Sequence, residues 1–101
     1  MNTHIDHEMA RLFYEAVLSL GDPDECESFF GDLCTTGELR AIAQRFYVAK
    51  LLSEGKIYTD IAAETGASTA TISRVNRVVT APLPPRGGCR EIIKRLEDMN
   101  G

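Results

Sequence analysis

Apolar residues recur every three to four positions along most of the chain, a spacing that places them on one face of an α-helix. No segment alternates apolar and polar residues with the period of two that marks a half-buried strand. The pattern therefore predicts an all-α fold without strands. The predicted helices cover residues 5–20, 23–34, 36–54, a pair of helices within 58–79, and 89–99.

Local signals indicate where several of these helices begin and end. Asp22 and Pro23 provide an N-cap and a first-turn proline for the second helix. Thr35 and Glu38 match a capping box, which predicts that the third helix starts between them. Prolines and glycines are concentrated between residues 82 and 88, so we expect a loop ahead of the last helix.

Residues 58–77, YTDIAAETGASTATISRVNR, match the steric requirements of a DNA-reading helix-turn-helix. Ala62 is small where the two helices would cross, and Gly66 can end the first helix in a left-handed conformation. Ser68 can accept a hydrogen bond from a free backbone N–H at the start of the second helix. A buried helical hairpin is the alternative, but it would not require these features together. The segment therefore favours DNA recognition.

The second helix of this segment, which we call the reading helix, has one apolar and one polar face. Ile72, Val75 and Val79 follow one another at helical spacing and are expected to face the core. The residues on the opposite side are small, polar or basic, which lets a helix enter the major groove and contact base edges or phosphates. These outer residues are Thr69, Ala70, Ser73, Arg74 and Arg77.

Charge is unevenly distributed along the chain. The whole sequence carries a net charge of −4, which alone would disfavour contact with a polyanion. Residues 1–65 contain 5 basic and 12 acidic side chains, whereas residues 66–101 contain 6 basic and 3 acidic ones. The positive charge therefore gathers at and after the reading helix, where phosphates would lie. Arg77, Arg90 and Lys94 are the predicted phosphate contacts, and a solvated basic face is the alternative.

The helix predicted over residues 36–54 is apolar nearly all round, which is typical of a helix buried on every side. One chain of 101 residues can hardly surround it while the reading helix stays exposed. We therefore expect an intertwined homodimer, which also suits palindromic DNA. Arg45 lies among these apolar residues and needs either an acidic partner, for which the N-terminal acids are candidates, or an anionic ligand.

Length and composition limit the class of protein. With 44% hydrophobic residues, the chain 1–101 is expected to form one domain with a single core and no membrane span. The N-terminus has acidic residues where a signal peptide needs a basic region and an apolar run. Cys26, Cys34 and Cys89 have no CxxC spacing, which suggests free thiols. Both observations predict a cytoplasmic protein.

Residues typical of catalysis are scarce. His4 and His7 are the two histidines, and the sequence lacks HExxH, GxSxG and a glycine-rich phosphate loop. We therefore expect neither an enzyme nor a metal site. A helical module that binds and regulates another protein is the main alternative function, although the basic C-terminal third favours DNA. Replication-origin binding is a third alternative, but initiators normally carry a nucleotide-binding domain.

Residues 33–96 resemble the tryptophan repressor family, most closely in the run GASTATISR at residues 66–74. The whole chain resembles the shorter YerC/YecD branch of tryptophan-repressor-like proteins. The resemblance implies an all-α, intertwined dimer in which the helix-turn-helix of each chain reads one half-site of an operator. It therefore implies a transcriptional regulator, in the first place a repressor. The base-contacting positions of the family correspond to Thr69, Ala70, Thr71 and Ser73.

The resemblance also implies a site for the corepressor tryptophan. Two arginines of the repressor hold the amino acid and correspond to Arg45 and Arg74, and a threonine that lines the pocket corresponds to Thr35. Where the repressor has a glycine and a serine beside the ligand, this sequence has Val75 and Val78. These branched side chains would take space that tryptophan needs. We expect a smaller anionic ligand or no corepressor, and no control by tryptophan.

Overall fold

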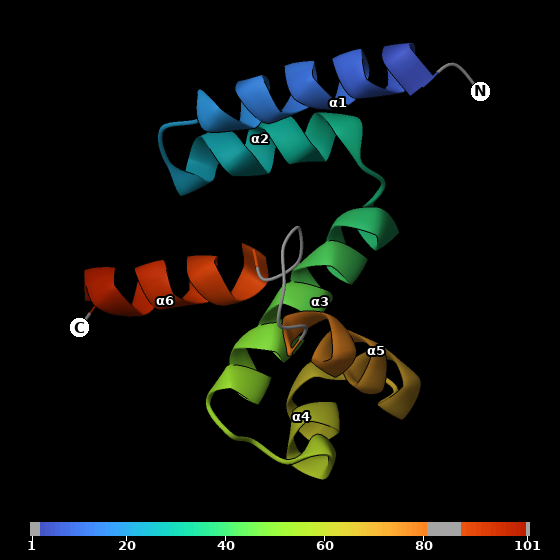
Figure 1. The fold of residues 1–101 in the computed structure, drawn as a ribbon, viewed down its shortest axis with the longest axis vertical. Coiled ribbons are helices and arrows are strands. Elements are labelled where there is room, and N and C mark those ends of the chain that lie inside the picture. Colours follow the sequence, from blue (N-terminus) through green and yellow to red (C-terminus); the bar gives the residue numbers. More distant parts are fainter. Residues whose placement is uncertain (1–2, 81–87, 101) are drawn as a thin grey trace. The chain divides into compact units, whose positions relative to one another are not determined.

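The computed structural model describes residues 3–80 and 88–100, and of residues 3–5 it describes the backbone alone. Within these residues the chain forms six helices and no strand, so the predicted all-α fold is confirmed (Figure 1). The expected loop at residues 82–88 lies almost entirely outside the described residues. The helices are α1 (Thr3–Leu18), α2 (Pro23–Leu33), α3 (Thr36–Ser53), α4 (Tyr58–Thr65), α5 (Thr69–Val79) and α6 (Gly88–Asn100).

The chain divides into two compact units, residues 1–39 and 40–101. The expectation that they form a single domain stays a prediction. In the first unit, α1 and α2 lie side by side and run in opposite directions (Figure 1). The ring of Phe13 on α1 stacks on that of Phe29 with 6.0 Å between centroids, and it meets Phe30 edge-on at 6.1 Å. These aromatic contacts hold the two helices together.

The N-terminal ends of α2 and α3 are capped as predicted. The Asp22 side chain accepts a hydrogen bond of 2.8 Å from the N–H of Glu25. At the start of α3, the N–H of Thr35 donates to the Glu38 carboxylate over 2.8 Å, and the N–H of Glu38 donates to the Thr35 hydroxyl over 3.1 Å. Both ends therefore satisfy backbone groups that a helix leaves free.

The capping box changes the acidity of Glu38. The hydrogen bond from the Thr35 backbone, and then that with its side chain, lowers the pKa of the Glu38 carboxyl below its usual value. A folded-state pKa below the unfolded one means that the cap contributes stability above the unfolded pKa. That contribution is lost as the pH falls through the folded pKa.

Two helices end slightly earlier than the sequence predicts. The N–H groups of Ser19 and Leu20 donate to carbonyls three residues back, each over 3.1 Å, so the last turn of α1 tightens and the helix ends at Leu18. α3 ends at Ser53, and Gly55 follows with a φ of 80°. Glycine adopts this left-handed conformation readily, which explains why α3 stops where it does.

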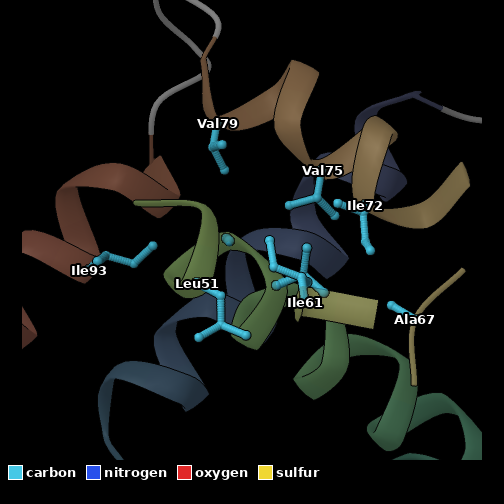
Figure 2. Close-up of a cluster of buried hydrophobic side chains, with 9 residues drawn as sticks. Leu51, Ile61, Ala67, Ile72, Val75, Val79 and Ile93 are labelled. Atoms are coloured by element: carbon cyan, nitrogen blue, oxygen red, sulfur yellow. The ribbon is translucent and has the colours of Figure 1, made fainter. Parts of the chain in front are cut away.

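The core of the second unit consists of nine buried apolar residues from α3, α4, α5, α6 and the turn before α5. Ile61 of α4 and Ile72 of α5 are fully enclosed, and Val75 lies beside them (Figure 2). The inward face predicted for the reading helix, α5, is confirmed, because its apolar stripe is buried. The core residues are Val48, Ala49, Leu51, Ile61, Ala67, Ile72, Val75, Val79 and Ile93.

α3 directs apolar residues both to this core and to solvent. Val48, Ala49 and Leu51 are buried, whereas Ile42 and Tyr47 are 52% and 47% exposed. Within one chain, α3 is therefore not buried on every side. Its exposed apolar residues are the surface that the predicted pairing with a second chain would cover.

α4 begins without a capping side chain. Its N-cap position is occupied by Ile57, which is 62% exposed and makes no side-chain hydrogen bond to the helix start. Replacing Ile57 with serine should supply an acceptor for a free N–H and raise the free energy of unfolding by about 1 kcal/mol. Thermal unfolding of Ile57→Ser beside Ile57→Ala is the measurement, because alanine removes the same apolar contacts without adding an acceptor. Equal midpoints for the two variants would contradict the prediction.

Candidate DNA-binding site

The turn between α4 and α5 has the geometry that the sequence predicts. Gly66 is left-handed, with a φ of 74° and a ψ of 5°, and its N–H donates to the carbonyl of Ala62 over 2.9 Å. A side chain at this φ would be strained, so glycine is required here. Ala62 is half-buried and packs against the core. The small residue and the glycine of a helix-turn-helix therefore occupy their expected places.

α5 starts at a capped end that carries no acidic side chain. The Ser68 hydroxyl accepts a hydrogen bond of 3.1 Å from the N–H of Thr71, which confirms Ser68 as the N-cap. Ser68 also donates to the Thr71 hydroxyl over 3.1 Å. The first turn of α5 contains no acidic residue. Since the N-terminal end of a helix carries partial positive charge, this end can approach a phosphate without repulsion.

The predicted DNA contacts all lie in the second unit, but they differ in exposure. Thr69 and Ala70 are exposed at the start of α5, whereas Thr71 and Ser73 are half-buried. The four basic candidates are exposed on α5 and α6, two helices that contact each other. The start of α5 and its basic neighbours are therefore accessible to a ligand as large as DNA. These basic residues are Arg74 and Arg77 on α5, and Arg90 and Lys94 on α6.

A cavity of about 390 Å³ lies between α3, α5 and the start of α6. Arg45 of α3 and Arg74 of α5 both line it, so the structure brings together the two arginines of the predicted ligand site. Within residues 6–80 and 88–100 neither arginine forms an ion pair, so the acidic partner considered for Arg45 is not found there. The lining residues are Ile42, Arg45, Phe46, Thr71, Arg74, Val75, Val78, Val79 and Cys89.

The walls of this cavity are apolar apart from the two arginines, a threonine and a thiol. Val75 and Val78 form part of the α5 side, and none of the nine lining residues is acidic. Thr35, the third residue of the predicted ligand site, caps α3 through its hydroxyl. Its role at a ligand stays a prediction. The cavity therefore offers positive charge and apolar surface to whatever enters it.

Gln44 of α3 contributes to the helix-turn-helix in a way that the sequence does not predict. Its side-chain N–H donates to the carbonyl of Thr65, the last residue of α4, over 3.0 Å. The Thr65 hydroxyl donates to the Ile61 carbonyl over 2.7 Å and accepts from the N–H of Ala67 over 3.1 Å. A glutamine within an apolar helix is the only signal in the sequence, and it does not identify a partner 21 residues away.

Comparison with known proteins identifies the family. A family model described as Trp repressor protein matches residues 8–96, which is most of the chain. The chain belongs to the Trp repressor family. YerC, an uncharacterized protein of Bacillus subtilis (strain 168), is 56% identical over 70 residues, which cover 69% of this chain. The match spans 66% of YerC, just under two thirds of that relative, and it confirms the resemblance to the YerC/YecD branch.

Two solved structures have the same fold. A TrpR-like protein from Eubacterium eligens ATCC 27750 gives a TM-score of 0.84 at 44% identity, over 95% of this chain and 96% of that one. A candidate Trp repressor from Staphylococcus aureus gives a TM-score of 0.77 at 36% identity, over 96% of this chain and 89% of that one. The predicted Trp-repressor-like helical fold is therefore confirmed.

Membership of the Trp repressor family supports DNA binding and transcription regulation. The family and the similar structures are of regulators, which confirms that the protein is not an enzyme. Among the described residues, no helix combines the length and the apolar character needed to cross a membrane. All three cysteines are free thiols, as expected. The absence of a metal site stays a prediction, since the side chain of His4 lies outside the described residues.

Proposed function

We propose that the protein is a sequence-specific transcription regulator that represses by binding a palindromic operator as a homodimer. The exposed face of α5 carries the proposal. Thr69 and Ala70 are exposed at a capped helix start that lacks acidic residues, and two exposed arginines follow. Small side chains allow close approach to base edges, and arginines reach phosphates or guanine. Membership of the Trp repressor family supports the same function.

Exposed apolar side chains support the pairing of two chains. In each unit several large apolar residues are more than half exposed, which is more than a monomer commonly leaves to solvent. Two-fold pairing would set two reading helices about 34–36 Å apart, in successive major grooves on one side of the DNA. The residues that a second chain would cover include Met9, Leu12, Tyr14, Leu18, Leu33, Ile42 and Met99.

Selection of bound fragments from random duplex DNA tests the proposed function. We expect an enriched palindrome whose half-site spacing reports the distance between the two reading helices. Sedimentation at micromolar concentration should give about twice the chain mass of 11.1 kDa. A helical module that binds another protein would instead show weak DNA binding with no preferred sequence. A monomer without an enriched sequence would overturn the proposal.

Thr69 and Arg77 should affect DNA binding in different ways. Arg77→Ala removes a phosphate contact, so binding to all sequences should weaken, and the salt slope should fall by about one unit for each phosphate that each chain no longer neutralises. Thr69→Ala should change the preferred sequence, at about 1–3 kcal/mol for a good base contact. Titrations of both variants on selected and random duplexes over a salt series distinguish the two effects. Equal losses on both duplexes for Thr69→Ala would show that Thr69 does not read bases.

The cavity between α3 and α5 supports a small anionic ligand as a second element of the proposal. Its volume of about 390 Å³ falls in the usual range for small-molecule sites. Arg45 and Arg74 bring two positive charges to it, and no lining residue is acidic. A carboxylate or phosphate is therefore favoured there, and a positively charged group is disfavoured. Free thiols and a DNA target are the grounds on which we assign the protein to the cytoplasm.

A further inference from the structure

Gln44 links α3 to the turn of the helix-turn-helix. Its side-chain amide donates to the carbonyl of Thr65 over 3.0 Å in a part-buried position. Thr65 is the last residue of α4, so its carbonyl has no hydrogen-bond partner within that helix. A side chain of α3 therefore satisfies a backbone acceptor at the point where the chain turns toward the reading helix.

The turn that receives this bond is itself held by hydrogen bonds. The Thr65 hydroxyl bonds to the Ile61 carbonyl and to the N–H of Ala67, and the N–H of Gly66 donates to the Ala62 carbonyl. Ala67 is 5% exposed and belongs to the core. Because residues 65–67 are bonded together, a contact that fixes the Thr65 carbonyl fixes the turn as a whole.

Apolar packing alone does not define this position as sharply. α3 meets α4 and α5 through aliphatic side chains such as Val48, Ile61 and Ile72. Hydrophobic contact is non-directional, so it tolerates small rotations of one helix over another. A hydrogen bond requires a narrow range of distance and angle. The bond from Gln44 therefore selects one pose of the helix-turn-helix among those that the core permits.

We propose that Gln44 is a positioning residue for DNA recognition. Its bond to Thr65 sets the pose of α5 relative to α3, and in the dimer it thereby sets the distance between the two reading helices. This inference rests on the proposed function, because spacing matters only to a protein that reads two half-sites. Gln44 itself touches no DNA in this proposal and acts through the turn.

The surroundings of the bond indicate that its loss should alter pose more than folding. Gln44 and Thr65 border an open cleft of about 280 Å³, whose other lining residues are Arg40, Ala43, Tyr47 and Glu64. Water can enter such a cleft and bond to the Thr65 carbonyl once the amide is removed. The carbonyl would then not be left unsatisfied, which is the main cost of deleting a buried hydrogen-bond partner.

Two replacements of Gln44 test the proposal. Gln44→Met keeps the length of the side chain without a donor, and ionised Gln44→Glu keeps the shape but offers only acceptors to the carbonyl. Both should lower the ratio of operator affinity to random-DNA affinity by about fivefold to tenfold, the effect of one hydrogen bond. Both should also flatten the preference among operators whose half-sites are moved apart or together by one base pair. Affinity of Gln44→Met for random DNA and its thermal midpoint should stay close to those of the unmodified protein.

Ala43→Glu is the matched control, because it places the same charge in the same cleft and keeps the Gln44 amide. It should retain the spacing preference. An equal effect of Ala43→Glu and Gln44→Glu, or an unchanged affinity ratio in Gln44→Met, would overturn the proposal. Loss of folding in Gln44→Met would overturn it as well, because the bond would then be required for stability and not for pose.

Amide hydrogen exchange separates this inference from the proposed function. The N–H groups of Gly66 and Ala67 should exchange faster in Gln44→Met than in Ala43→Glu, whether or not DNA is present. Unchanged exchange at both groups would overturn the link between Gln44 and the turn. Faster exchange in a protein that does not distinguish operator from random DNA would instead show that the link exists and that the proposed function is wrong.

Discussion

Ile61→Ala is expected to lower the free energy of unfolding by about 2–5 kcal/mol, the usual cost of truncating a fully buried isoleucine. Ile61 is 0% exposed and lies beside Ile72 and Val75 in the core (Figure 2). The loss combines the transfer of the removed groups with the cavity that they leave. Since total stabilities are about 5–15 kcal/mol, such a variant should also lose DNA binding at moderately raised temperature. Urea unfolding at fixed protein concentration measures the effect, because pairing makes stability depend on concentration.

Ile57→Ala is the control for this prediction, since it makes the same chemical change in an isoleucine that is 62% exposed. Its effect should stay within about 0.5 kcal/mol, as for most surface substitutions. Similar losses for Ile57→Ala and Ile61→Ala would mean that α4 does not pack as the structure shows. In that case Ile57 would have to be buried in the assembled protein.

Features set by neighbouring residues are the ones that the sequence predicts well. The caps at Asp22, Thr35 and Ser68 depend on side chains three residues or fewer from the N–H groups that they bond. The left-handed turn at Gly66 depends on the residue itself. The buried stripe of α5 follows from helical periodicity. Each of these requires information from one turn of helix, which the sequence contains directly.

Features set by distant residues are not predicted in the same way. The bond from Gln44 to Thr65 spans 21 residues, and no local pattern encodes it. The half-burial of Thr71 is intermediate between the two cases. Residues 71, 74, 75 and 78 follow the spacing of a second helical stripe, and all four line the cavity. That spacing is visible in the sequence, but what the stripe faces depends on where α3 lies.

The resemblance to the Trp repressor family predicts which residues meet at the cavity, but not its volume. Arg45 and Arg74 line it together, as the family pattern implies. Val75 and Val78 also line it, and a space of about 390 Å³ remains beside them. Volume depends on how several side chains pack at once. The case against tryptophan therefore rests on the polarity of the walls as well as on the bulk of the two valines.

Tryptophan is expected to leave operator binding unchanged. Its carboxylate suits Arg45 and Arg74, but its ammonium group would lie beside two guanidinium groups in a cavity without an acidic residue. Val78 has no hydrogen-bond acceptor for that ammonium group, and Val75 adds bulk next to the ring. Overfilling a packed site costs about 1–3 kcal/mol, which would weaken a micromolar affinity by about one to two orders of magnitude.

Calorimetry with tryptophan at millimolar concentration and operator titrations with and without it test both parts of this prediction. The double variant Val75→Gly/Val78→Ser is the positive control, because it restores the glycine and the serine that the family resemblance places beside the ligand. It should bind tryptophan more tightly than the unmodified protein, although glycine within α5 will cost about 1 kcal/mol of stability. If the unmodified protein binds tryptophan at micromolar concentration and then holds its operator more tightly, the valines do not obstruct the ligand. The ammonium group must then find an acceptor outside the described lining, for which the partner chain of the proposed dimer is the nearest source.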